Sequence, residues 1–154
     1  MNYNDFPILN NDEYNLINSH YSNFERFDRK TTIIKIYNEI SGCKNICLDL
    51  SSKHNPKIKK AIEQAYETLN KLNENLLTSF NLNNTESNTI KTCSLFSFMR
   101  KITNLSSSVL EWSKSEKKEY FKSIAQSTMK DLFNIMLNLT SALEESNIIL
   151  FKHM

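Results

Sequence analysis

The sequence is poor in the two residues that make tight turns, with one glycine and two prolines among 154 residues. β-Sandwiches, barrels and doubly wound sheets need many such turns, and phosphate-binding loops need several glycines close together. The composition therefore argues strongly against these architectures, and it excludes a glycine-rich phosphate loop. A helical fold, which needs few turns, is the class that remains.

Cysteines and long apolar runs are also scarce. Cys43, Cys47 and Cys93 are the three cysteines, and an odd, small number is not a disulfide scaffold but fits a reducing compartment. The segment after Met1 is not a basic stretch followed by an apolar run, and no run of about 18 apolar residues occurs. We therefore expect a cytoplasmic protein without a membrane span, and export without a cleavable signal would also be compatible with the sequence.

No charge of one sign dominates the chain. Nineteen basic and 17 acidic residues give a net charge of +2, and only three of the basic residues are arginines. This balance does not indicate a polyanionic partner. A protein that recognises nucleic acid usually contains more arginine. Hydrophobic residues make up 40% of the chain, enough to bury a core in one domain.

We predict an all-α fold, a single-domain bundle of about five helices over residues 11–154, preceded by a flexible polar arm at 1–10. A first helix is expected at 11–27, and a second from Asp28 or Thr31 to Gly42. The lone glycine after a periodic apolar stretch is typical of a left-handed helix cap. Residues 43–50 are then predicted to form a short connector. A β-strand at 31–37 is the alternative for the second helix, because that run is rich in β-branched residues.

Three longer amphipathic helices follow, at roughly 56–80, 93–112 and 114–146. Asn55–Pro56 is a strong start signal for the first of them, and Ser113 with Glu116 offers a capping box for the last. The polar, Asn-rich segment at 81–91 is expected to be a mobile loop. Apolar residues recur at steps of three and four through each helix; in the first they are Ile58, Ile62, Ala65, Leu69, Leu72 and Leu76.

No constellation of residues predicts catalysis or metal binding. Cys43, Cys47 and His54 offer three possible zinc ligands where a structural site needs four. Cys93 at a helix start could be an activated thiol, yet no histidine stands in a familiar catalytic context. Paired carboxylates fall on polar helix faces: Glu63 with Glu67, Glu116 with Glu119, and Glu144 with Glu145. We expect a non-enzymatic protein without metal or cofactor.

Aromatic and methionine side chains crowd the C-terminal half of the chain. The ordinary interpretation of these residues is a hydrophobic core. The more specific interpretation is a surface that binds a helix of a partner protein, because such residues dominate protein interfaces. The last three helices carry more apolar surface than a five-helix monomer needs. The candidate partner-binding residues are Phe96, Met99, Trp112, Met129, Phe133 and Met136.

Lysines gather near the expected starts of the helices at 56–80 and 114–146. A helix N-terminus already carries partial positive charge, so these lysines together could attract an anion. A solvated surface is the ordinary interpretation of such a charge run. The candidate anion-binding residues are Lys53, Lys57, Lys59, Lys60, Lys114, Lys117 and Lys118.

These features favour a small protein-protein interaction module that binds another protein, or a second copy of itself, through apolar and aromatic helix faces. An adaptor, an immunity protein or inhibitor, a dedicated chaperone and a pathogen effector would all have this composition. The alternative is a helical protein associated with nucleic acid through the two lysine groups, a partner that the near-neutral charge disfavours.

Overall fold

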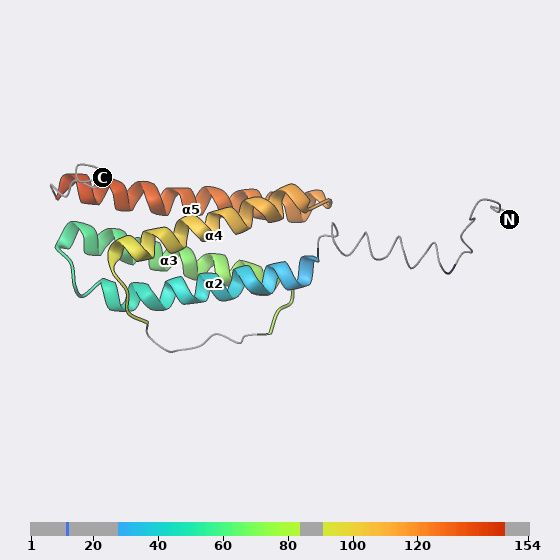
Figure 1. Cartoon of the computed structure of the whole chain (residues 1–154), viewed down its shortest axis with the longest axis horizontal. Coiled ribbons are helices and arrows are strands. Elements are labelled where there is room, and N and C mark those ends of the chain that lie inside the picture. The colour runs from blue at the N-terminus through green and yellow to red at the C-terminus, as the bar shows by residue number, and fades with distance from the viewer. Residues whose placement is uncertain (1–11, 13–27, 84–90, 147–154) are drawn as a thin grey trace.

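The computed structural model describes residues 12, 28–83 and 91–146, and it confirms the all-α class (Figure 1). Four helices account for most of these residues, where the sequence predicted about five in the whole chain. The helix expected at 11–27 falls almost wholly outside the described residues, as does the arm expected at 1–10. The four helices are α2 (Arg29–Leu50), α3 (Pro56–Ser79), α4 (Leu95–Ser115) and α5 (Glu119–Glu145).

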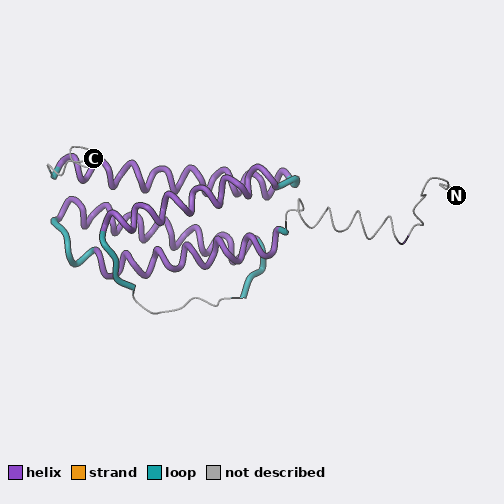
Figure 2. The backbone as a smooth tube through the Cα atoms, viewed as in Figure 1, coloured by secondary structure: helices purple, strands orange, loops and turns teal. Residues whose placement is uncertain are grey.

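The helices form a four-helix bundle in which every neighbouring pair is antiparallel. α2 packs against α3 and α4, and α5 packs against the same two helices. Figures 1 and 2 show that α2 and α5 run in one direction and that α3 and α4 run in the other. Short turns at 51–55 and 116–118 join α2 to α3 and α4 to α5. α3 ends at one end of the bundle and α4 begins at the other, so the connection 80–94 has to bridge its length.

The core consists of one apolar stripe from each helix, as the sequence pattern predicts. All six stripe residues of α3 are buried, and Leu69 and Leu76 are completely inaccessible to solvent. Burying a leucine or isoleucine side chain contributes about 1.5–3 kcal/mol, so these stripes are the main source of stability. The stripe of α4 is equally buried: Leu95, Phe98, Ile102, Leu105, Val109 and Trp112.

Side-chain caps fix the beginnings of three helices. Asn55 starts α3 as predicted, because its Oδ1 accepts a hydrogen bond from the backbone N–H of Ile58 at 3.0 Å and Pro56 follows it. Asp28 accepts from the Thr31 hydroxyl at 2.8 Å and caps α2. Ser94 caps α4, because its Oγ accepts a hydrogen bond from the backbone N–H of Ser97 at 3.1 Å. The boundaries of α3 and α4 therefore lie close to the predicted ones.

The prediction that Gly42 ends the second helix is wrong. α2 continues through Gly42 to Leu50, and Gly42 does not adopt a positive φ. Residues 43–50, predicted to be a connector, are helical because four apolar side chains extend the stripe into the core: Cys43, Ile46, Cys47 and Leu50. The alternative strand at 31–37 is also wrong, since these residues belong to α2.

The predicted capping box at Ser113 and Glu116 is wrong as well. α4 extends to Ser115, so Ser113 lies within it and is buried. Glu116 ends α4, with its backbone N–H donating to the carbonyl of Trp112 at 2.8 Å, and α5 begins only at Glu119 without a side-chain cap. In the loop predicted at 81–91, residues 81–83 and 91 are described and lie outside helices.

Candidate functional site

Exposed apolar side chains lie on α4 and α5. Phe96 is 54% exposed on α4, and Phe133 and Leu137 are 52% and 53% exposed on α5. The two helices run antiparallel from a short turn at 116–118 and both rise 1.5 Å per residue, which places Phe96 at about the level of Leu137. These three residues are called the apolar face below.

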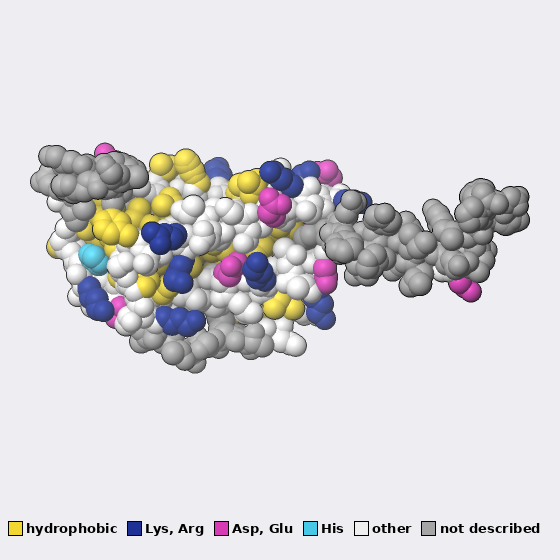
Figure 3. Space-filling view, in the orientation of Figure 1, with side chains coloured by type: hydrophobic (Ala, Val, Ile, Leu, Met, Phe, Trp, Pro, Cys, Tyr) yellow, Lys and Arg dark blue, Asp and Glu magenta, His cyan; other side chains and the backbone are white. Residues whose placement is uncertain are grey.

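Two methionines form the inner edge of the apolar face. Met129 and Met136 on α5 are half-buried and pack against the core. In the space-filling view, hydrophobic side chains gather over α4 and α5 toward the end of the bundle where α4 begins (Figure 3). Thioethers adapt to irregular surfaces, so half-buried methionines beside exposed phenylalanines are typical of surfaces that accept a partner.

The flank of α4 that carries Phe96 is opposite its flank toward α2. Lys101 and Asn104 line a groove between α4 and α2. Residues three or four apart share a helix face, whereas Phe96 stands five positions before Lys101, about 140° away around the helix and therefore on the opposite flank. The apolar face therefore belongs to the α4–α5 side of the bundle.

Two predicted partner-binding residues belong to the core. Trp112 is completely buried and Met99 is 8% exposed. The ring of Trp112 packs edge-on against Phe80 at 5.7 Å between ring centroids. Their position on the inner stripe of α4 explains the burial, and it removes both from the set that a partner could touch in this conformation.

The predicted anion-binding lysines do not form one site. Lys53, Lys57, Lys59 and Lys60 lie at the α2–α3 end of the bundle, and Lys114, Lys117 and Lys118 lie at the α4–α5 end, all of them exposed. A 24-residue helix is about 36 Å long, so the two groups stand a bundle length apart.

Some of these lysines also have partners within the bundle. Lys53 pairs with Asp49 at 2.9 Å, and Lys57 lies 3.7 Å from Glu145. The ammonium of Lys118 lies over the ring of Phe121 at 5.9 Å. The positive charge at each end is therefore divided and partly compensated.

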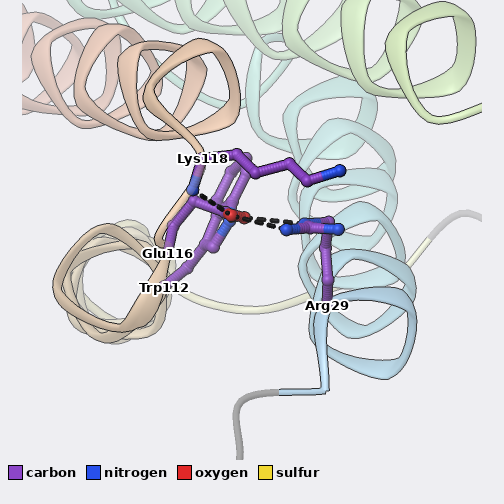
Figure 4. Close-up of polar contacts among 4 residues, drawn as sticks. All are labelled: Arg29, Trp112, Glu116 and Lys118. Carbon is purple, nitrogen blue, oxygen red and sulfur yellow. Dashed lines mark hydrogen bonds and ion pairs between the residues drawn. The ribbon is translucent and has the colours of Figure 1, made fainter.

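A buried carboxylate ties the α4–α5 turn to the start of α2 (Figure 4). The side chain of Glu116 is fully buried and accepts two hydrogen bonds from Arg29, at 2.9 and 2.7 Å. It also accepts from Nε1 of Trp112 and from the backbone N–H of Lys118, each at 3.1 Å. The guanidinium of Arg29 in turn lies 4.7 Å above the ring of Phe121.

These contacts lower the pKa of Glu116 to about 2. The hydrogen bond from Arg29 is the largest cause, burial opposes it, and the N–H groups of Lys118 and Trp112 add to it. The same hydrogen bond raises the pKa of Arg29. A carboxylate that is always ionised and has four donors on it is a poor general base, so this cluster holds the bundle together rather than acting on a substrate.

The cysteines lie near one another but are not activated. Cys43 and Cys47 are buried in α2, and Cys93 is half-buried just before α4. Burial raises the pKa of Cys43 to about 12 and raises the pKa values of Cys47 and Cys93 as well. Over residues 28–83 and 91–146, no cluster of three or more histidine, cysteine or acidic side chains could hold a metal ion.

The predicted partner-binding set leaves out Leu137, Leu48 and Tyr120, whose side chains are also exposed. Leu137 and Leu48 stand off the core stripes of their helices, and that position is the signal that could have identified them. The contact between Arg29 and Glu116 joins residues that are 87 positions apart in the chain, so no local sequence pattern predicts it.

Among the described helices, none combines the length and the apolar composition that a membrane-spanning helix needs. No protein-family model, no curated protein and no solved structure matches this chain.

Proposed function

We propose that this protein is a non-enzymatic protein-protein interaction module that binds its partner through the apolar face of α4 and α5. The observation that carries the proposal is the exposure of Phe96, Phe133 and Leu137, each by more than half, on one side of the bundle. Aromatic and large aliphatic side chains at the centre of an interface supply most of its binding energy. An adaptor, an inhibitor, a chaperone and an effector would all use such a surface.

The distribution of charge favours a protein partner over a nucleic acid. The two lysine groups are separated by the length of the bundle, so they do not form the continuous basic stripe that tracks a phosphate backbone. The formal net charge of the whole chain is only +2. Binding through the apolar face is expected to tolerate salt, whereas binding through phosphates weakens steeply as salt rises.

The chemistry of the polar groups supports the absence of catalysis. Glu116 is held by Arg29 and Trp112, and burial keeps the thiols of Cys43 and Cys47 protonated. A nucleophile or a general base needs a free lone pair at working pH. Neither the Glu116 carboxylate nor either of the two thiols meets that requirement.

The test is affinity capture with matched variants of the full chain. The double variant Phe96→Asp and Phe133→Asp places charge on the apolar face. Leu48→Asp makes the same kind of change at a residue of α2 that is 48% exposed. A partner retained by the wild type and by Leu48→Asp at high salt and after nuclease, and lost from the double variant, would support the proposal. Equal retention by all three proteins would refute it.

A third variant separates the two classes of partner. Lys57→Glu, Lys59→Glu and Lys60→Glu together reverse the charge at the α2–α3 end. We expect this variant to bind like the wild type. Capture that depends on these lysines and disappears with salt or nuclease would assign the function to a polyanion instead. Circular dichroism of each variant establishes that its helices are intact.

A further inference from the structure

The outer surface of α5 carries a stripe of seven residues whose spacing is symmetric about Phe133. The intervals between them are four, three, four, four, three and four, so all seven lie on one side of the helix. Each of them is exposed or half-buried, and two of them, Phe133 and Leu137, belong to the apolar face. The residues, called the α5 stripe below, are Lys122, Gln126, Met129, Phe133, Leu137, Thr140 and Glu144.

Side chains of the α5 stripe at equal distances from Phe133 match in chemistry. Met129 and Leu137, four residues away on either side, are both apolar. Gln126 and Thr140, seven residues away, can both donate and accept hydrogen bonds. Two copies of α5 packed antiparallel with Phe133 against Phe133 would therefore bring apolar groups onto apolar groups and polar groups onto polar groups.

The ends of the α5 stripe carry opposite charges. Lys122 lies near the start of α5 and Glu144 near its end, each eleven residues from Phe133. The helix dipole favours acidic side chains at the start of a helix and basic ones at its end, so neither charge lies where its own helix favours it. Within the described part of the chain, neither side chain has an ion-pair partner. In an antiparallel pair of α5 helices, Lys122 of one copy would lie beside Glu144 and the helix end of the other.

We propose that the partner of the apolar face is a second copy of this chain, bound through the α5 stripe in an antiparallel dimer with twofold symmetry. This inference rests on the proposed function, because it names the partner of the same surface. In a twofold interface both copies use the same patch, so each copy has to carry both members of every contact. The α5 stripe meets this requirement, because six of its residues form three complementary pairs and Phe133 lies on the axis.

The size of the surface is sufficient for a dimer. The 22 positions from Lys122 to Glu144 extend about 33 Å along α5. With α4 beside α5 the surface is about 20 Å wide, which gives about 650 Å² per copy, and the smallest stable complexes bury about 600 Å² per partner. Lys130 is an exposed charge near the α5 stripe. Its two copies would stand about 9 Å apart along the helix axis, where salt screens much of their repulsion.

The experiment is sedimentation velocity of the full-length protein at about 1 to 300 µM. We expect the wild type to change from monomer to dimer as its concentration rises. Phe133→Asp places two carboxylates against each other on the axis and should weaken the dimer about thirtyfold or more. Tyr120→Asp is the control, because Tyr120 is 66% exposed on the same helix but lies off the α5 stripe, and this variant should dimerise like the wild type. A wild type that stays monomeric, or equal dimerisation by the two variants, would overturn the proposal.

Charge reversal tests the antiparallel arrangement. Lys122→Glu and Glu144→Lys each turn two attractive pairs into repulsive ones, and each should weaken the dimer about tenfold. An equimolar mixture of the two variants restores opposite charges at both pairs, so it should form a heterodimer with the affinity of the wild type. Both reversals suit the helix dipole, so a loss of association would not come from a weaker helix. Unchanged dimerisation of either variant alone, or a mixture that does not recover, would contradict the arrangement.

Failure of the dimer and failure of the proposed function give different results. A monomeric wild type that captures a different protein, with capture lost from the double variant Phe96→Asp and Phe133→Asp, would overturn the dimer and leave the proposed function standing. A monomeric wild type whose captured proteins are also retained by the double variant would overturn both. Concentration-dependent dimers that are lost with Phe133→Asp and recovered by the charge-reversed mixture would support both.

Discussion

Replacing Glu116 by glutamine is expected to destabilise the protein substantially, because the change removes the charge from a fully buried carboxylate with four hydrogen-bond donors on it. The pKa of Glu116 falls from its ordinary value of 4.5 to about 2, which corresponds to about 3 kcal/mol of native-state stabilisation. Arg29 is 32% exposed, so solvent screens part of this interaction. We expect Glu116→Gln to lower the free energy of unfolding by about 2 kcal/mol at pH 7.

The assay is urea denaturation followed by the fluorescence of Trp112, the only tryptophan in the chain. Its indole N–H donates to Glu116, so the signal reports the unfolding of the same region. Glu145→Gln is the control, because Glu145 and its partner Lys57 are 57% and 58% exposed and lie 3.7 Å apart. An exposed ion pair contributes at most about 1 kcal/mol, and we expect a smaller effect than for Glu116→Gln.

The dependence on pH provides an independent check. The pKa of Glu116 is lower in the folded protein than in the unfolded chain, so its contribution is fully present above pH 4.5 and is lost as the pH falls toward 2. The stability difference between wild type and Glu116→Gln should therefore shrink over that range. A difference that matches the Glu145→Gln control at pH 7, or that does not change with pH, would refute this reasoning.

Three further predictions concern Gly42, the cysteines and the core. Gly42→Ala should raise the free energy of unfolding by about 0.5–1 kcal/mol in urea denaturation, because Gly42 lies inside α2 with space for a methyl group; a loss of stability would show that something covers the site closely. Cys93 should react with a thiol reagent at pH 8 well before Cys43 and Cys47, whose burial and raised pKa values protect them; equal rates, measured spectrophotometrically, would contradict the burial. Leu69→Ala should lower the free energy of unfolding by about 2–5 kcal/mol, because Leu69 is completely buried; a denaturation midpoint near that of wild type would be inconsistent with this core.

The three long helices were predictable because their apolar residues repeat at steps of three and four without interruption. The pattern of α3 from Ile58 to Leu76 fixes both the helix and its buried face, and Asn55–Pro56 fixes its start. Intrinsic propensity predicted the wrong helix end at Gly42. A glycine inside a helix costs about 1 kcal/mol, and the burial of Cys43 and Leu50 beyond it outweighs that cost.

The turn between α4 and α5 could not be predicted from local patterns. Glu116 looked like half of a capping box, but its partner Arg29 is 87 residues away in the chain and only the folded bundle brings them together. The candidate surface was predictable in part. Phe96 and Phe133 were chosen correctly as residues that reach the surface, whereas Trp112 and Met99 share the same composition but face inward. Only the orientation of each helix in the bundle separates the two groups.

The measurement that tests the proposed function most directly is the hydrogen-exchange footprint of the protein bound to whichever partner it captures at high salt. Binding through the apolar face predicts slower exchange in the complex around Phe96 on α4 and around Phe133 and Leu137 on α5, with little change at the lysine-bearing ends of the bundle. Protection confined to the turns that carry Lys57 and Lys117, with exchange around Phe96 and Phe133 unchanged, would contradict the account.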